Sequence, residues 1–193
     1  MPEIYIEQKG EMDRMVSSAF LAKLNDSCKN LIIMKLKYVD LSVISVNDLS
    51  QYLKELYLMR CEIPIDWFSK NMFNNLETLD LSESSRVCVK HLKDLATNNC
   101  KKTLKHLILS QCYRIDDKAI EFVTTEFLDL TCLKVDGTVI SDLSIHWICN
   151  RLKYLNELNI QNCKFLKNPD IEFIEESHKH NDFKLVYKNK EQL

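Results

Sequence analysis

Eight cysteines are the residues of this chain that could most readily do chemistry, by binding zinc, forming disulfides or acting as nucleophiles. They are Cys28, Cys61, Cys88, Cys100, Cys112, Cys132, Cys149 and Cys163. No two are spaced as C-x-x-C, and no Cys/His pattern typical of a zinc site is present. Because the chain does not open with a secretory signal, we expect a reducing compartment and free thiols. Free cysteines behave as small buried hydrophobic residues.

Acidic residues and histidines could also bind metal or transfer protons. Asp116 and Asp117 form a carboxylate pair, but they lie where the repeat described below would begin a helix, and acids there cap backbone N–H groups. For His178 and His180 we expect a solvated helix end, because no carboxylate or cysteine pattern accompanies them. The other histidines are His91, His106 and His146. No nucleophile accompanies them recognisably, so we predict a non-enzymatic protein without cofactor or bound metal.

The composition argues against several functional classes. The 26 basic and 28 acidic residues give a formal charge of -2, so the basic surface typical of nucleic-acid binding is missing. The two glycines, Gly10 and Gly137, are too far apart to form a phosphate-binding loop. No apolar run approaches the roughly 20 residues that span a bilayer. We expect a soluble protein of the cytoplasm, the nucleus or both.

A repeated pattern of leucines organises the chain. The pattern L-x-x-L-x-L-x-x-C occurs with its first leucine at Leu53, Leu104 and Leu155. Looser copies begin at Leu31, Leu76 and Leu130. The first leucines of successive copies are 22 to 28 residues apart, a range typical of leucine-rich repeats.

The alternation within each copy predicts a short strand whose leucines point inward and whose intervening residues point outward. Stretches with helical spacing, around Val89–Ala96 and Ile120–Val123, lie between the strands. They would return the chain over the back of the sheet, as a parallel crossover requires. The sequence therefore predicts an α/β fold, a right-handed leucine-rich-repeat solenoid of the horseshoe type. Its parallel sheet would form the concave face and its helices the convex face.

We expect one domain over residues 1–193, with about six repeats in residues 28–175. Residues 1–27 and 176–193 would cap the two ends, because an open solenoid end exposes leucines and strand edges. The first cap would be a strand around Ile4 and Ile6 and a helix over about residues 13–24, and the second a strand over about residues 183–187 with a polar tail.

The ninth position of each copy holds a small residue, in order Val39, Cys61, Ser84, Cys112, Thr138 and Cys163. Several of these side chains can make a weak hydrogen bond near the turn after each strand, so packing accounts for three of the eight cysteines. Cys28 and Cys100 precede strands and are predicted to be buried at helix ends. Cys132 takes an outward-facing strand position and is predicted to be an accessible thiol.

The stretch from Cys100 to Ile120, CKKTLKHLILSQCYRIDDKAI, resembles the cysteine-containing leucine-rich repeat. Shorter versions recur at Thr138–Asp142 and Cys163–Ile171. This subtype is typical of F-box/leucine-rich-repeat proteins and of the related antagonist-of-mitotic-exit-network proteins, and the resemblance covers about residues 28–175. It implies the substrate receptor of a cullin-type (SCF-like) ubiquitin ligase, whose separate F-box docks the ligase adaptor.

The F-box itself is not recognisable in the sequence. It begins with a Leu-Pro dipeptide before an amphipathic helix and needs about 40 residues, whereas residues 1–27 are too few and contain no Leu-Pro. Three alternatives therefore stay open: a receptor without its box, an adaptor that docks by another route, and a repeat protein without a link to ubiquitin.

A protein partner is expected on the concave face. The candidate binding residues are Lys35, Tyr57, Met59, Arg60, Asp80, His106, Ile108, Lys134, Asp136 and Asn159. Tyr57 and nearby Arg60 form the predicted anchor, because tyrosine and arginine are enriched at binding hot spots. The alternative is that these side chains only pack on one another. The mixed charges favour a protein over a phosphate-bearing ligand.

The leading functional hypothesis is a substrate-recruiting or adaptor module of a ubiquitin ligase, acting as a monomer. A second is a scaffold or assembly factor resembling the mitochondrial ATP-synthase coupling factor B, which the acidic start of the chain disfavours. A third is an inhibitor that covers an enzyme, in the manner of ribonuclease-inhibitor-like repeats.

Overall fold

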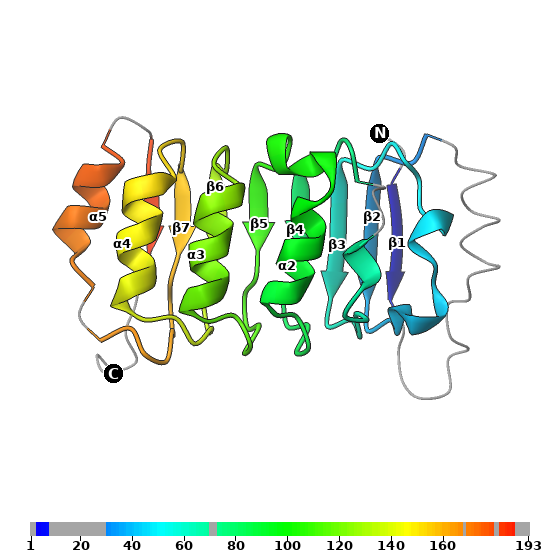
Figure 1. Ribbon diagram of the computed structural model, residues 1–193, viewed down its shortest axis with the longest axis horizontal. Helices are drawn as coiled ribbons and strands as arrows, with labels where there is room; N and C mark the ends of the chain where they lie inside the picture. Colours follow the sequence, from blue (N-terminus) through cyan, green and yellow to red (C-terminus); the bar gives the residue numbers. More distant parts are fainter. Residues whose placement is uncertain (1–2, 8–29, 70–72, 168, 180–181, 188–193) are drawn as a thin grey trace.

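The computed structural model describes residues 3–7, 30–69, 73–167, 169–179 and 182–187. One parallel sheet of eight strands runs through these residues in sequence order. The strands are β1 (Glu3–Glu7), β2 (Ile33–Lys37), β3 (Glu55–Met59), β4 (Thr78–Asp80), β5 (His106–Ile108), β6 (Cys132–Lys134), β7 (Glu157–Asn159) and β8 (Lys184–Val186). Figure 1 shows the helices side by side across one face of the sheet. The predicted leucine-rich-repeat solenoid is confirmed.

The segments that return the chain differ along the solenoid. Four are α-helices: α2 (Val89–Ala96), α3 (Asp117–Glu126), α4 (Asp142–Arg151) and α5 (Ile171–Ser177). The first repeats use 3-10 turns instead: η1 (Leu41–Val43), η2 (Val46–Asp48) and η3 (Trp67–Ser69), and a further turn, η4 (Asn99–Lys102), follows α2. The first two repeats are also the shortest, which leaves fewer residues for a helix between strands.

The inward strand positions form one continuous core. Leu56, Leu79, Leu107, Leu133 and Leu158 are fully buried and lie in register on adjacent strands. Burial of one leucine side chain contributes roughly 1.5–3 kcal/mol to the free energy of unfolding. Each of these leucines is buried by residues of the neighbouring repeats as well as of its own. The stability of any one repeat therefore depends on the next.

Side chains at the ninth position connect several repeats to the one before. The Sγ of Cys112 donates to the carbonyl oxygen of Leu81 at 3.1 Å, and the Sγ of Cys163 donates to that of Val135 at 3.2 Å. The hydroxyl of Ser84 does the same to Leu58 at 2.8 Å. These acceptors all occupy the sixth position of the preceding repeat. A cysteine or serine at the ninth position is therefore a hydrogen-bond donor between repeats, whereas Thr138 donates within its own repeat, to Val135 at 2.6 Å.

Burial keeps these thiols protonated, as a donor must be. It raises the pKa of Cys112 to about 12 and that of Cys61 to about 11, and it also raises the pKa of Cys163. All the cysteines in the described part of the chain are free. The interpretation of the ninth-position cysteines as packing residues agrees with this geometry.

The eighth position turns the chain sharply after each of the strands β2 to β7. Its residues all have positive φ: Tyr38, Arg60, Glu83, Gln111, Gly137 and Asn162. Only one is a glycine, the residue that tolerates this conformation best. Their N–H groups join the repeats, as at Gln111, which donates to the carbonyl of Asp136 at 2.7 Å, and at Gly137, which donates to Gln161 at 2.8 Å.

The carboxylate pair has two structural roles. Asp116 is the N-cap of α3 and accepts from the N–H of Ala119 at 3.0 Å, as predicted for a capping residue. Asp117 bonds to the start of α4, accepting from the Ser141 N–H at 2.9 Å, the Ser141 hydroxyl at 2.7 Å and the Ser144 hydroxyl. Burial alone would raise the pKa of Asp117, but these hydrogen bonds outweigh it and the pKa is lowered.

The prediction of a solvated helix end was wrong for His178. This residue is only 2% exposed, and its ring nitrogens lie 3.0 and 3.1 Å from the carbonyl oxygens of Ile174 and Leu152. Its ring stacks on Phe183, the residue before β8, with centroids 4.6 Å apart. His180, Cys28 and the helix expected over residues 13–24 lie outside the described residues.

The two roles of the carboxylate pair generate a stability prediction. Asp117→Asn removes a charged acceptor between α3 and α4, so we expect the free energy of unfolding to fall by roughly 1–3 kcal/mol at pH 7. Because the folded-state pKa lies below the unfolded one, this contribution is present above the unfolded pKa and is lost as pH falls through the folded pKa. We therefore expect the difference in unfolding free energy between variant and wild type to become smaller below about pH 4, as measured by urea unfolding at neutral and acid pH.

The control is Asp142→Asn, which changes an exposed carboxylate in the first turn of α4. Its expected cost is below about 1 kcal/mol. Equal losses for the two variants, or a loss at Asp117 that does not change with pH, would contradict the bridging role.

Candidate functional site

The open face is the side of the sheet opposite the helices, and the outward side chains of its strands form a central and an outer column. The central column contains Tyr5, Lys35, Tyr57, Asp80, Ile108, Lys134, Asn159 and Val186, and adjacent members are partners in the strand register. An outer column contains Glu3, Ile33, Glu55, Thr78, His106, Cys132, Glu157 and Lys184 in the same register. The period of two places both sets on one face.

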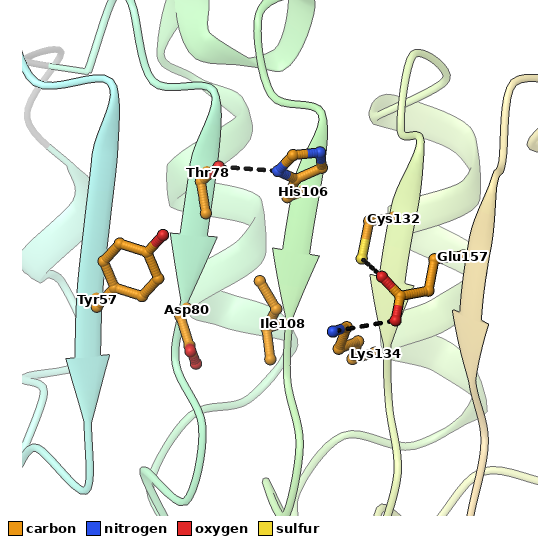
Figure 2. Close-up of a pocket in the computed structure, with 8 residues that line it drawn as sticks. All are labelled: Tyr57, Thr78, Asp80, His106, Ile108, Cys132, Lys134 and Glu157. Atoms are coloured by element: carbon orange, nitrogen blue, oxygen red, sulfur yellow. Dashed lines mark hydrogen bonds and ion pairs between the residues drawn. The ribbon is translucent and has the colours of Figure 1, made fainter. Parts of the chain in front are cut away.

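A hollow lies in the middle of the open face, over β3 to β7. It has a volume of about 340 Å³ and is lined by Tyr57, Thr78, Asp80, His106, Ile108, Cys132, Lys134 and Glu157 (Figure 2). The lining combines an aromatic ring, an aliphatic side chain and ionisable groups, as in sites that bind part of another molecule.

On one side of the hollow, an ion pair between Lys134 and Glu157 holds the side chains in place. Lys134 Nζ lies 3.2 Å from Glu157 Oε1, and the Cys132 thiol donates to Glu157 Oε2 at 3.5 Å (Figure 2). Burial alone would raise the pKa of Glu157, but its bonds with Lys134 outweigh burial and the pKa is lowered. Glu157 therefore stays a carboxylate that fixes both neighbours.

The other side contains Tyr57 and Asp80. The Tyr57 hydroxyl donates to Glu55 at 2.8 Å, and burial together with this bond raises the pKa of Tyr57 to about 12. Lys35 Nζ lies 5.2 Å from the centre of the Tyr57 ring. Asp80 accepts from the Ser82 N–H at 2.8 Å and from the Ser82 hydroxyl, yet burial raises its pKa despite these bonds.

The structure separates the candidate residues into three groups. Tyr57, Asp80, His106, Ile108 and Lys134 line the hollow. Lys35, Met59, Asp136 and Asn159 take outward positions on the face or at the ends of its strands, outside that lining. Arg60 belongs to the turn edge, where it bonds to Glu83 and lies 5.3 Å from the centre of the Tyr38 ring.

Sequence reasoning left three lining residues out of the candidate set, namely Thr78, Cys132 and Glu157. All three share the column of His106, which was included, so membership of that column was the available signal. Thr78 Oγ1 lies 3.0 Å from His106 Nδ1. Through this hydrogen bond Thr78 orients the imidazole ring of His106 at the edge of the hollow.

The prediction of an accessible thiol at Cys132 was wrong. The residue points to the open face as expected, but it is only 8% exposed. Burial, together with the charge of Glu157, raises the pKa of Cys132 to about 12. An outward position in a parallel sheet is exposed only if its neighbours are short, and here His106 and Glu157 occupy the flanking strands.

Neither a metal centre nor a membrane span is found in the described part of the chain. No group of three or more His, Cys, Asp or Glu side chains there is arranged to hold a metal ion. Within the same residues, no helix has the length and apolar character needed to cross a membrane.

The fold and the open face define the chain as a leucine-rich-repeat solenoid. In sequence it resembles human F-box/LRR-repeat protein 12, with 26% identity over 156 residues that cover 78% of this chain and 47% of the relative. The mouse protein of the same name matches to the same extent. The chain therefore spans about half the length of the curated relatives it matches. No protein-family model matches the sequence.

Solved structures agree on the fold. A chain from the yeast Rad7 and Elc1 complex superposes with a TM-score of 0.61 at 13% identity, covering 95% of this chain and 54% of that one. The internalin InlF of Listeria monocytogenes superposes with a TM-score of 0.58 at 15% identity, covering 96% of this chain and 55% of the internalin. At such identities the likeness concerns the fold alone.

The surroundings of Cys132 predict slow alkylation. A pKa of about 12 leaves about one thiol in ten thousand ionised at pH 8, and the thiolate is the reactive form. In the native protein, iodoacetamide should modify Cys132 at least roughly a hundredfold more slowly than in urea, as measured by peptide mass spectrometry. The partly exposed Cys88 serves as the internal comparison and should react faster. Equal native and unfolded rates at Cys132 would contradict the assigned environment.

Proposed function

We propose that this chain is a non-enzymatic protein-interaction module that holds a protein partner on its open face. The observation that carries the proposal is the hollow of about 340 Å³ at the centre of a sheet face that no described helix covers, where Tyr57 and Ile108 are only half-buried. Anchor residues of binding sites lie in such central hollows, surrounded by polar side chains that exclude water.

The more specific proposal is that the module is a substrate-recognition or adaptor subunit of an SCF-like cullin ubiquitin ligase, acting as a monomer in the cytoplasm or nucleus. Two findings support it. The sequence resembles F-box/LRR-repeat protein 12, and the fold occurs in the yeast Rad7 and Elc1 complex, where a chain of this shape is found with a second protein. A scaffold or enzyme-covering role would use the same face without a ligase.

Affinity capture from cells tests both the general proposal of an interaction module and the specific proposal of a ligase subunit. Wild-type chain is compared with Tyr57→Ala/Ile108→Glu, which removes the aromatic wall and places a charge on the floor of the hollow. We expect ligase components in both samples, and a further protein, the bound substrate, at least tenfold reduced with the variant. The readout is quantitative mass spectrometry.

The matched control is Tyr154→Ala/Leu128→Glu, which makes the same two changes at exposed sites outside the open face. Thermal unfolding must first show that all three proteins are folded. If no ligase component is captured by any of them, the ubiquitin proposal fails and the recovered partner defines the function. If every recovered protein binds the open-face variant as well as the wild type, the open face is not the binding site.

A further inference from the structure

The charges of the open face are unevenly paired. Its lysines all have carboxylate partners: Lys35 with Glu3, Lys37 with Glu7 at 3.0 Å, and Lys134 and Lys184 with Glu157 at 3.2 and 3.7 Å. Three carboxylates of the face, Glu55, Asp80 and Asp136, have no basic group within 4 Å among the described residues, and Glu55 accepts instead from the Tyr57 hydroxyl. The centre of the face therefore carries carboxylates without an ion-pair partner in the described part of the chain.

Asp80 is the carboxylate that lines the hollow. Both hydrogen bonds from Ser82 go to its Oδ1, and within the described residues no donor is bonded to Oδ2. Asp136 accepts from the Ser110 hydroxyl at 2.6 Å. Besides burial, the charge of Asp136 raises the pKa of Asp80, while the charge of Lys134 lowers it. Asp80 thus lines the hollow with one carboxylate oxygen to which no described donor is bonded, and a cation there would offset the cost of its burial.

The neighbours of Asp80 suit a long side chain with a flat cationic end. Figure 2 shows Tyr57 on one neighbouring strand and Ile108 on the other, with Asp80 between them. Ile108 offers an apolar surface for a methylene stem, and the Tyr57 ring already attracts the ammonium group of Lys35. A guanidinium stacks on aromatic rings and is weakly hydrated, so arginine fits better than lysine.

We propose that the hollow receives an arginine side chain from an extended segment of the partner protein, with Asp80 as its carboxylate partner. The proposal rests on the proposed function and adds the chemistry of the ligand. The guanidinium lies against Asp80 Oδ2 and the Tyr57 ring, and the stem covers Ile108. An acidic segment is disfavoured, because it would meet Asp80 and Asp136 while the nearest ammonium, that of Lys134, stays with Glu157.

The probe is a phage-displayed library of random linear peptides, selected on the full chain. Selected sequences are synthesised with a fluorophore, and their Kd is measured by fluorescence anisotropy. We expect enrichment of arginine at one position, with a loss of about tenfold or more when that arginine becomes alanine or when the chain carries Asp80→Asn. The amide oxygen of Asp80→Asn still accepts from Ser82, so the strand end keeps its hydrogen bonds.

Two further variants make the outcome decisive. Asp142→Asn, the same change on the helical side, should leave the Kd within twofold. An Asp80→Arg chain should prefer the peptide whose arginine is replaced by glutamate, which tests contact directly. The proposal is overturned if the library yields no peptide whose affinity depends on Asp80.

The result also separates this proposal from the proposed function. Peptides that lose affinity for Tyr57→Ala/Ile108→Glu but bind Asp80→Asn normally would leave the open face as the binding site and remove arginine as its ligand. Peptides indifferent to both variants would count against both proposals.

Discussion

The structure depends on the hydrogen bonds that join each repeat to its neighbour at the end of the strand. A cysteine or serine at the ninth position donates from its side chain to the preceding repeat, as Cys112 does to Leu81, and the eighth residue donates from its backbone to the following one, as Gln111 does to Asp136. A single repeat cannot bury its own leucines, so stacking is obligatory, and these bonds fix the register in which it occurs. A shift by one residue would turn every leucine toward the open face.

This register determines what the open face can present. Because strand positions align across the sheet, residues far apart in sequence become neighbours: Tyr57 and Asp80 on β3 and β4, and Cys132 and Glu157 on β6 and β7. The lysines of the face pair with carboxylates, whereas Asp80 in the hollow has no ion-pair partner among the described residues and lies beside the half-buried Tyr57 and Ile108. A rigid sheet holds these groups in place before a partner arrives, so little conformational entropy is lost on binding.

Much of this arrangement could be predicted from the sequence, because the repeat pattern determines both the fold and the direction of each strand side chain. The columns of the open face followed from a period of two, and Asp116 was correctly interpreted as a cap. The wrong predictions concern side chains whose exposure depends on the size of the neighbouring side chains and not only on the direction in which they point. Cys132 points outward but is covered by its flanking residues, and His178 is buried against Phe183, five residues further along the chain. The αL turn residues were also not foreseen, because five of the six are not glycine and carry no composition signal.

The donor role of the ninth position is tested most directly by comparing Cys112→Ser with Cys112→Ala in urea unfolding. Serine keeps a donor of similar size, as Ser84 does naturally, whereas alanine leaves the Leu81 carbonyl without its partner. We predict that the alanine variant loses roughly 1–3 kcal/mol of unfolding free energy more than the serine variant, the cost of an unsatisfied buried polar group. If serine is as destabilising as alanine, or more so, Cys112 contributes only apolar packing and the hydrogen bonds between repeats do not set the register.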